Sequence, residues 1–346
     1  MDDQVTSIPN RKDEHLRICL EENVRSTRSA GFEKIELLVD ALPDLTYGNI
    51  DTSQVVFDKK LSAPILISSM TGGSGKTKFF NQMLAQAANE FNIAMAVGSQ
   101  RAAIIHPELE ETFRIVRRES PEALLFANLG AVQLNHGFGL KECQKAVDML
   151  EADGLYLHLN ALQEALQPEG DRDFSDLLSK IEKLTGQLSV PVLVKEVGCG
   201  ISFENARRLI DAGVRGIDIA GLGGTSWAAV EMYRQTDLMR KSVCRNFIDW
   251  GIPTADCLLS MKDFPENIML VSSGGLETGI DIAKSIAMGA NLSGFARKFI
   301  VAANEGELQL RQTIEQLILE LKIAMYCTNS ATLTQLAGKW ELKKGL

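Results

Sequence analysis

Eight short apolar runs, separated by stretches of helical pattern, are the feature that most limits how this chain can fold. They lie at residues 65–69, 93–97, 123–127, 154–157, 190–194, 216–219, 268–271 and 292–295. Because the runs are continuously apolar instead of alternating, they are typical of parallel strands that helices cover. Helical patterns fill the gaps, for example at residues 204–212 and 279–288. Eight strand–helix units over roughly 240 residues predict a single (β/α)8 TIM barrel, since a doubly wound sheet seldom needs eight regular units.

Polar side chains follow each of these runs. In a barrel the carboxyl ends of all eight strands meet on one face, which is where barrel enzymes carry out their chemistry. The densest group follows the fourth run, where His158, Asn160, Gln163 and Glu164 lie within seven residues. A turn and a capped helix would account for the nearby Asp171 but not for this group. We therefore expect the group to line the rim of a site.

The whole chain divides into three parts. We expect an N-terminal helical extension at residues 1–63 that packs on the barrel mouth, the barrel at 64–328, and a C-terminal tail at 329–346. The extension opens with an amphipathic helix from Arg11, and an irregular segment follows at residues 31–63. Within the barrel, we expect a helix from about Lys78.

Composition and charge exclude several functions. A net charge of −9 without any basic block argues against a nucleic-acid partner. No apolar window is long enough to cross a bilayer, and no secretory segment is visible, so we expect a cytoplasmic protein without a membrane partner. The six cysteines form no Cys-x-x-Cys pair, which favours small buried thiols in a reducing compartment over a metal site.

Two glycine-rich stretches suggest where a ligand would bind. The stretch at residues 72–77 is similar to a P-loop, but Met70 stands where the motif needs a glycine, so we interpret it as a turn over which a planar ligand can lie. Gly274-Gly275 and Ala296-Arg297 follow the last two runs, the standard phosphate site of barrels. Either pair alone could be a simple turn, and together they favour a phosphate.

Charged residues define two further candidates. Lys195 ends a buried strand, where an anion or an electron-rich ring is a better partner than solvent. Arg101 and the cations at residues 11–15 could bind a second anion across the barrel mouth, although a solvated helix start is the simpler interpretation of Arg11 and Lys12. Glu164 is either a Mg²⁺ ligand beside a bound diphosphate or an ordinary helix-start carboxylate.

Seven segments, taken in order, closely resemble the type 2 isopentenyl diphosphate isomerases. They lie at residues 11–15, 69–73, 98–101, 128–131, 157–164, 195–198 and 223–227. The match covers nearly the whole chain, from Arg11 to Phe299, and departs at residues 39–43, where we would expect a histidine. The resemblance implies an FMN-dependent barrel that needs Mg²⁺ and NADPH or another reductant. It also implies conversion of isopentenyl diphosphate into dimethylallyl diphosphate by 1,3-allylic proton transfer, in a homo-oligomer (tetramer or octamer).

The resemblance also implies roles for individual residues. Those expected around FMN are Ser69, Met70, Thr71, Ser99, Asn128, Lys195, Thr225, Gly274, Gly275, Ala296 and Arg297. Those expected to face the substrate are Arg11, Lys12, His15, Ser99, Arg101, His158, Asn160 and Gln163. The expected catalytic residues are His158, Gln163, Trp227 and Glu231, and Glu164 is the expected metal ligand.

Neither His158, Gln163 nor Glu231 is a strong enough acid to protonate an unactivated alkene unaided. Our hypothesis is therefore that reduced FMN is the acid–base catalyst, with Lys195 stabilising its anionic form and Trp227 shaping the pocket. Three alternatives remain. A hydroxy-acid oxidoreductase would need a His-Gly pair after a late strand, and a nucleotide dehydrogenase would need a cysteine within residues 216–241; the sequence has neither. A non-catalytic flavin-binding barrel would not need Gln163, Glu164 or the second cation group.

Overall fold

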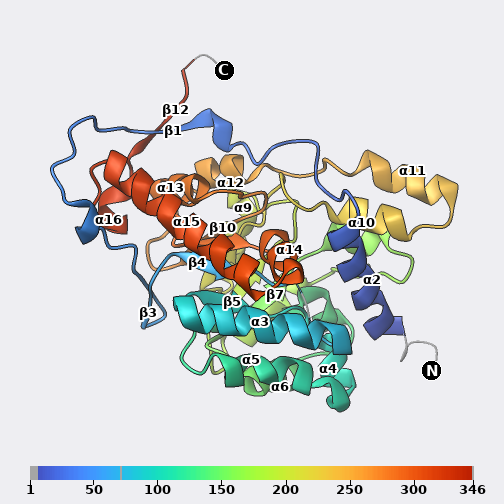
Figure 1. The fold of residues 1–346 in the computed structure, drawn as a ribbon. Helices are drawn as coiled ribbons and strands as arrows, with labels where there is room; N and C mark the ends of the chain where they lie inside the picture. Colours follow the sequence, from blue (N-terminus) through green and yellow to red (C-terminus); the bar gives the residue numbers. More distant parts are fainter. Residues whose placement is uncertain (1–6, 71, 345–346) are drawn as a thin grey trace.

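A closed barrel of eight parallel strands forms the centre of the molecule (Figure 1). The structure is a computed structural model of the 346-residue chain that describes residues 7–70 and 72–344, with side chains from Arg11 onward. Around the barrel the strands follow the order β10, β11, β4, β5, β6, β7, β8, β9. Their bounds are β4 (Ile65–Ile67), β5 (Ala94–Ala96), β6 (Leu125–Gly130), β7 (Gly154–His158), β8 (Val192–Lys195), β9 (Gly216–Asp218), β10 (Met269–Ser273) and β11 (Leu292–Phe295). The predicted (β/α)8 barrel is confirmed.

Each predicted apolar run overlaps one strand, but some ends differ. Strand β6 continues to Gly130, so Asn128 lies within the strand and not after it. Strand β8 begins at Val192, two residues later than predicted, because Pro191 has no N–H group to donate to a neighbouring strand. These differences leave the order of the strands unchanged.

Helices surround the barrel on the outside (Figure 1). The longer ones are α3 (Gly75–Phe91), α5 (Glu111–Glu119), α6 (Leu140–Leu150), α8 (Leu177–Thr185), α9 (Phe203–Asp211), α10 (Trp227–Arg234), α11 (Leu238–Asn246), α12 (Thr254–Ser260), α13 (Gly279–Ala287), α14 (Arg297–Glu305) and α15 (Glu307–Cys327). Short helices α4 (Arg101–Ile105), α7 (Ala161–Leu166) and α16 (Leu333–Leu336) fill the loops. Helix α3 begins three residues before the predicted Lys78, because Ser74 caps its first turn by accepting from the N–H of Thr77.

Side chains fill the barrel, so it is a packed core and not a pore. Leu66, Phe126, Leu193 and Val271 are at most 2% exposed and contact one another from four different strands. Burying each such side chain contributes about 1.5–3 kcal/mol. A larger apolar layer lies between the strands and the outer helices. This rigid scaffold fixes the positions of the strand ends that carry the site.

The N-terminal segment is more ordered than its sequence predicts. Helix α2 (Ser7–Glu21) begins four residues before the predicted Arg11. The segment predicted as irregular contains β1 (Ile35–Leu37) and the hairpin of β2 (Gln54–Val56) and β3 (Lys59–Leu61), with single helical turns at Phe32–Lys34 and Tyr47–Asn49. The tail returns to this segment, because β12 (Trp340–Leu342) pairs with β1.

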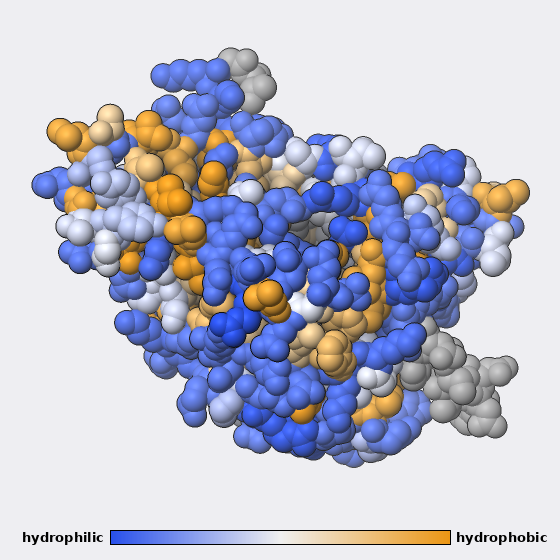
Figure 2. Space-filling model, in the orientation of Figure 1, coloured by the Kyte–Doolittle hydropathy of each residue, from blue (hydrophilic) through white to orange (hydrophobic). Residues whose placement is uncertain are grey.

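The surface and the cysteines add two observations. Figure 2 shows hydrophobic side chains at two edges of a mostly hydrophilic face: over the loop after β1, where Val39 and Leu42 are exposed, and at the tip of α11, where Leu238 is exposed. The prediction of six buried thiols is wrong for Cys199, which is partly exposed, and for Cys327, which is exposed. None of the described helices combines the length and the hydropathy that a bilayer span requires.

Candidate active site

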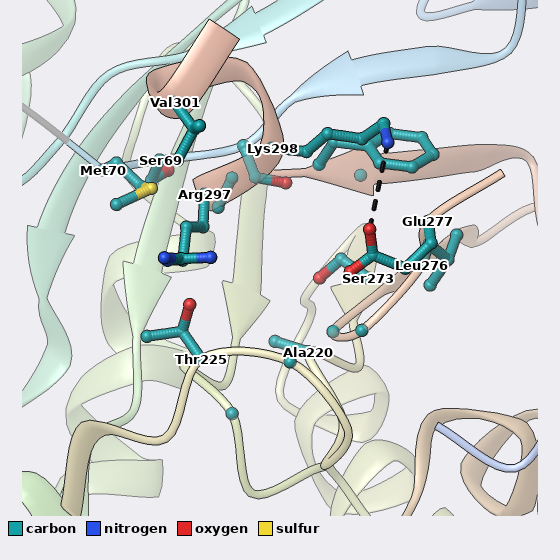
Figure 3. A pocket seen from close by; sticks show the side chains of 18 of the residues that line it. Ser69, Met70, Ala220, Thr225, Ser273, Leu276, Glu277, Arg297, Lys298 and Val301 are labelled. Carbon is teal, nitrogen blue, oxygen red and sulfur yellow. Dashed lines mark ion pairs between the residues drawn. The ribbon is translucent and has the colours of Figure 1, made fainter. Parts of the chain in front are cut away.

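Two adjoining cavities open at the carboxyl ends of the strands. The larger has a volume of about 370 Å³, and the smaller about 140 Å³. The larger is lined by Ser69, Met70, Lys195, Thr225, Gly274, Gly275, Ala296 and Arg297, among others (Figure 3). The smaller is lined by Arg11, Lys12, His15, Ser69, Ser99, Arg101, Asn128, His158, Asn160, Gln163, Glu164 and Trp227, among others. Met70, Lys195 and Trp227 line both, so the two cavities share a wall.

The wall of the larger cavity at the end of β10 is bare backbone. Gly274 has a φ of 99°, and a Cβ atom there would lie 2.1 Å from the carbonyl oxygen of Gly221. Helix α14 starts at the next strand end with no side-chain cap, which leaves its first N–H groups free to bind an anion. The hydroxyls of Ser68 and Ser69 also line this cavity, and both are buried without a partner among the described residues. The donors present suit a phosphorylated, polar cofactor.

Cations frame this cavity, and they include residues that the sequence patterns did not single out. Figure 3 shows Arg297 between Met70 and Thr225, while Lys298 and Glu277 meet at another side of the cavity. The Nζ of Lys298 lies 3.8 Å from Oε2 of Glu277, which also forms an ion pair with Arg25. Lys298 and Glu277 could have been predicted from the sequence, because each follows a predicted site residue within two positions. No sequence pattern near Arg25 indicates that it belongs to the site.

Lys195 lies between the two cavities. It is 5% exposed, and its Nζ donates to the carbonyl oxygen of Glu196 at 2.6 Å. Its strand neighbours are His158 on β7 and Asp218 on β9. Burial raises the pKa of Asp218, and the charge of Lys195 and a hydrogen bond from Ser273 oppose that rise. Lys195 is therefore a buried lysine that lines both cavities.

The loop after β8 is organised by Glu196. One oxygen of its carboxylate accepts from the backbone N–H groups of Val197, Gly198 and Cys199, at 2.6, 2.7 and 2.5 Å. Burial raises the pKa of Glu196 to about 7, against the opposing effect of these three hydrogen bonds. The carboxylate fixes a loop whose Val197 lines both cavities, a role that its place in the sequence does not reveal.

Lys12 points into the smaller cavity from helix α2. Its Nζ donates to the carbonyl oxygens of Gly72, at 2.5 Å, and Ser99, at 2.6 Å. Burial, together with the charges of Arg11 and Arg101, lowers the pKa of Lys12 to about 7. The interpretation of Lys12 as part of a solvated helix start is therefore wrong, because helix α2 covers the cavity and takes the ammonium out of water.

Arg101 is held in the smaller cavity by an aspartate. Its Nη1 lies 2.6 Å from Oδ2 of Asp171, which also accepts from Nε2 of Gln133 at 2.9 Å. The Nε of Arg101 is buried and has no partner among the described residues, so it is free to donate to a ligand. The prediction that a turn accounts for Asp171 missed this contact, because 70 residues separate the two side chains in the sequence.

The group after β7 lines the smaller cavity. Oε1 of Glu164 accepts from Nδ2 of Asn160 at 2.7 Å, while Oε2 accepts from Gln167 and from the backbone N–H of Asp171, the latter at 2.7 Å. Oδ1 of Asn160 is buried without a partner in the described part of the chain. Within residues 7–70 and 72–344, no group of three or more His, Cys, Asp or Glu side chains could hold a metal ion. A divalent cation beside Glu164 would therefore need ligand oxygens from a substrate and water.

His158 is neutral at physiological pH. Burial, together with the charges of Lys195 and Lys12, lowers the pKa of His158 to about 3. In contrast, Glu231 on α10 is charged. Burial would raise its pKa, but the hydrogen bond and charge of His15 and the charge of Arg234 outweigh burial and lower it. The carboxylate accepts from His15 at 3.1 Å and from Gln163 at 3.2 Å, both at Oε1.

All of the predicted site residues except Thr71 and Glu231 line one or both cavities, and Ser99 and Asn128, which were expected around FMN, line only the smaller one. Thr71 lies outside the described residues. Glu231 reaches the smaller cavity through His15 and Gln163, and the ring of His15 stands edge-on to that of Trp227 with centroids 5.1 Å apart. The barrel end therefore joins a cavity that suits an anion and a cation-lined cavity, with Trp227 and Glu231 four residues apart on one helix beside them.

Comparisons with known proteins agree with this geometry. Residues 142–341 match the family model described as FMN-dependent dehydrogenase. Solved structures of mandelate oxidase, one with (S)-2-phenylpropionate and one with 3,3-difluoro-2-hydroxy-3-phenylpropionic acid, have TM-scores of 0.65 at 17% and 16% identity. The first alignment covers 99% of this chain and 98% of the oxidase chain, and the second covers 99% of both. Fold and site thus define an FMN-dependent dehydrogenase-type barrel.

Curated relatives identify one family within this class of barrel. The isopentenyl-diphosphate delta-isomerase of Nostoc sp. is 48% identical over 337 residues, which are 97% of this chain and 96% of the relative. That of Rickettsia canadensis is 48% identical over 333 residues, or 96% and 97% of the two chains. The chain belongs to the isopentenyl-diphosphate delta-isomerase family, and the resemblance drawn from its sequence is confirmed.

Proposed function

We propose that this chain converts isopentenyl diphosphate into dimethylallyl diphosphate, with FMN in the larger cavity and the diphosphate in the smaller one. The observation that carries the proposal is the shared wall of Met70, Lys195 and Trp227 between the cavities. A flavin ring in one cavity and an alkene in the other would meet there. The proposal includes Mg²⁺, NADPH or another reductant, and a cytoplasmic homo-oligomer.

The larger cavity suits FMN. Its phosphate would be held by the free N–H groups at the start of α14 and by the bare backbone of Gly274 and Gly275, with Arg297 close by. Lys195 would lie against the ring, and its buried charge would favour an anionic form. In its reduced state FMN would supply the acid–base group beside the alkene.

The smaller cavity suits a diphosphate. Arg11, Lys12 and Arg101 bring three cations to one side, and the unpartnered Nε of Arg101 is an available donor. Arg101 is already paired with Asp171 and Arg11 with Glu169, so these side chains would neutralise a diphosphate only in part. Mg²⁺ at Glu164 would balance the remainder, with phosphate oxygens and water completing its coordination. The unpartnered Oδ1 of Asn160 lies beside Glu164, so the oxygen donors there suit this hard cation.

The side chains between the cavities suit an allylic proton shift. The terminal carbon of isopentenyl diphosphate gains a proton and C2 loses one, so the net redox change is zero. Positive charge develops on the tertiary carbon between these events. The anionic Glu231 and the face of Trp227 would stabilise that charge, and neutral His158 and Gln163 would orient the substrate. The Trp227 ring would also exclude water that could otherwise trap the cation.

An anaerobic assay in deuterated water tests the proposal. The purified holoenzyme is reduced once and then supplied with isopentenyl diphosphate and Mg²⁺. We expect many turnovers for each reduction, with deuterium in a methyl group of the product. Consumption of one reductant per product, or full activity with the flavin left oxidised, would contradict the proposal. A parallel assay with a 2-hydroxy acid should leave the flavin oxidised, since neither β9 nor β10 is followed by a histidine that could act as a base.

A further inference from the structure

Arg234, the last residue of α10, binds three carboxylates that come from three segments of the chain. Its Nε donates to Glu14 on α2 at 2.9 Å, and its Nη2 donates to Glu169 in the loop after α7 at 2.8 Å. Its Nη1 donates to Glu231 on its own helix at 2.7 Å. The Arg234 side chain is only 11% exposed. Burial opposes its charge, and the three carboxylates outweigh burial and raise the pKa of Arg234.

Helix α2 is held in two different ways along its length. Its C-terminal half is anchored by apolar packing, because Ile18 and Cys19 are at most 1% exposed and contact Ala229 and Val230 of α10. None of residues 11–15, the first residues of α2 with described side chains, belongs to an apolar cluster. Residues 11–15 are instead tied by polar contacts, such as Asp13 to the hydroxyl of Ser74 at 2.5 Å. This polar half carries the side chains that line the smaller cavity.

The contact between Glu14 and Arg234 joins this polar half to the catalytic side of the cavity. Arg11 shares the same arrangement, since its Nη1 lies 3.6 Å from Oε1 of Glu169, the atom that accepts from Arg234. Glu231 receives Arg234 at Oε2 and both His15 and Gln163 at Oε1. Moving Arg234 would therefore disturb the residues of α2 and the carboxylate of Glu231 together.

Only an arginine can make all three contacts at once. The guanidinium is planar and presents five donors in a fixed fork, whereas an ammonium is a compact point charge. A lysine at position 234 could keep one carboxylate, and Glu231 on the same helix is the nearest along the chain. The other two carboxylates would lose their partner.

We propose that Arg234 is a positioning residue that latches the N-terminal turns of α2 over the smaller cavity and orients Glu231 through the same side chain. The nature of the ligand in that cavity rests on the proposed function. The latch itself is a property of contacts within this chain, and it can be measured without any substrate.

Hydrogen exchange of the holoenzyme tests the latch directly. In Arg234→Met, we expect the amides of residues 11–15 to exchange at least about tenfold faster, because three carboxylates lose a partly buried partner. The amides of residues 16–21 should keep their protection, since their apolar anchor is intact. Glu21→Gln is the matched control: it removes an exposed ion pair with Arg17 on the same helix and should leave residues 11–15 unchanged. Equal exchange in Arg234→Met and the wild-type protein would overturn the proposal.

Steady-state kinetics then separate the contact of Arg234 with Glu14 from its contact with Glu231. Glu14→Gln removes only the contact with α2, so we expect KM for isopentenyl diphosphate to rise about two- to fivefold at unchanged kcat. Arg234→Met should raise KM and lower kcat, and Arg234→Lys should recover part of kcat while KM stays high. A purely structural role would instead lower the amount of folded enzyme with KM unchanged in all three variants. Wild-type enzyme without isomerase activity would refute the proposed function, while the exchange experiment would still decide the latch.

Discussion

Nδ1 of His158 lies 2.7 Å from Oδ1 of Asn128 on the neighbouring strand β6. An amide oxygen can only accept, so Nδ1 carries the proton and Nε2 does not. Burial beside Lys195 and Lys12 lowers the pKa of His158 to about 3, which keeps this tautomer through the physiological range.

We therefore expect His158 to remain neutral down to about pH 5. Nitrogen-15 NMR of the four histidines should show one imidazole with a protonated Nδ1 and a bare Nε2 whose shifts do not change between pH 8 and 5. The His158→Asn variant assigns that signal by its loss. An imidazole at position 158 that titrates near its ordinary pKa of about 6.5 would contradict this prediction.

Binding of diphosphate should be coupled to protonation of Lys12. In the free protein the pKa of Lys12 is about 7, so at pH 8 most of the population is neutral. A bound anion stabilises the ammonium and raises that pKa, so binding takes up a proton, and affinity falls as pH rises above 7. Calorimetry with inorganic diphosphate at pH 8, in buffers of different ionisation enthalpy, measures this uptake. Lys12→Met corrects for protons on the ligand, and the difference should approach about one proton per site. Equal uptake by the two proteins would show that Lys12 does not respond to the anion.

Removing the charge of Glu164 should weaken the response to Mg²⁺. In Glu164→Gln we expect activity to fall about tenfold or more, in line with loss of a metal ligand or its support, and half-maximal activity to need more Mg²⁺. FMN content should not change, because Glu164 lines only the smaller cavity. Glu182→Gln, an exposed change on α8, is the control for loss of one negative charge. Full activity of Glu164→Gln at limiting Mg²⁺ would place the metal elsewhere.

A methyl group at position 274 should exclude FMN. The backbone of Gly274 has a φ of 99°, and a Cβ atom would meet the carbonyl oxygen of Gly221 at 2.1 Å, so this wall of the cavity must shift. Gly289→Ala separates crowding from strain, because its φ is 103° and open space surrounds it. Each change costs about 1–2 kcal/mol in backbone conformation, so both should lower the melting temperature. Only Gly274→Ala should also lose flavin absorbance after purification; a full complement of FMN in that variant would be evidence against a phosphate site at this turn.

The barrel and the ends of its strands follow from local patterns in the sequence. An apolar run such as residues 123–127 must be buried wherever it lies, and eight such runs with helices between them leave few other folds. Once the strands are parallel, topology alone brings Met70, His158, Lys195 and Arg297 to one face. The residues on that face could therefore be predicted from the sequence, although the contacts among them could not.

The contacts that give the site its chemistry were decided by the tertiary structure. Arg101 and Asp171 are 70 residues apart, and Arg234 and Glu14 are 220 apart, with no periodicity that links either pair. From the sequence, Lys12 is one charged residue in a charged stretch. Its pKa is lowered only because α2 packs over the cavity and buries the side chain. Hydropathy is a property of each residue and repeats along the chain, so sequence determines which segments are buried. Burial of a particular charge, and the partner that it meets, depend on which distant segment covers it, so only the folded chain determines them.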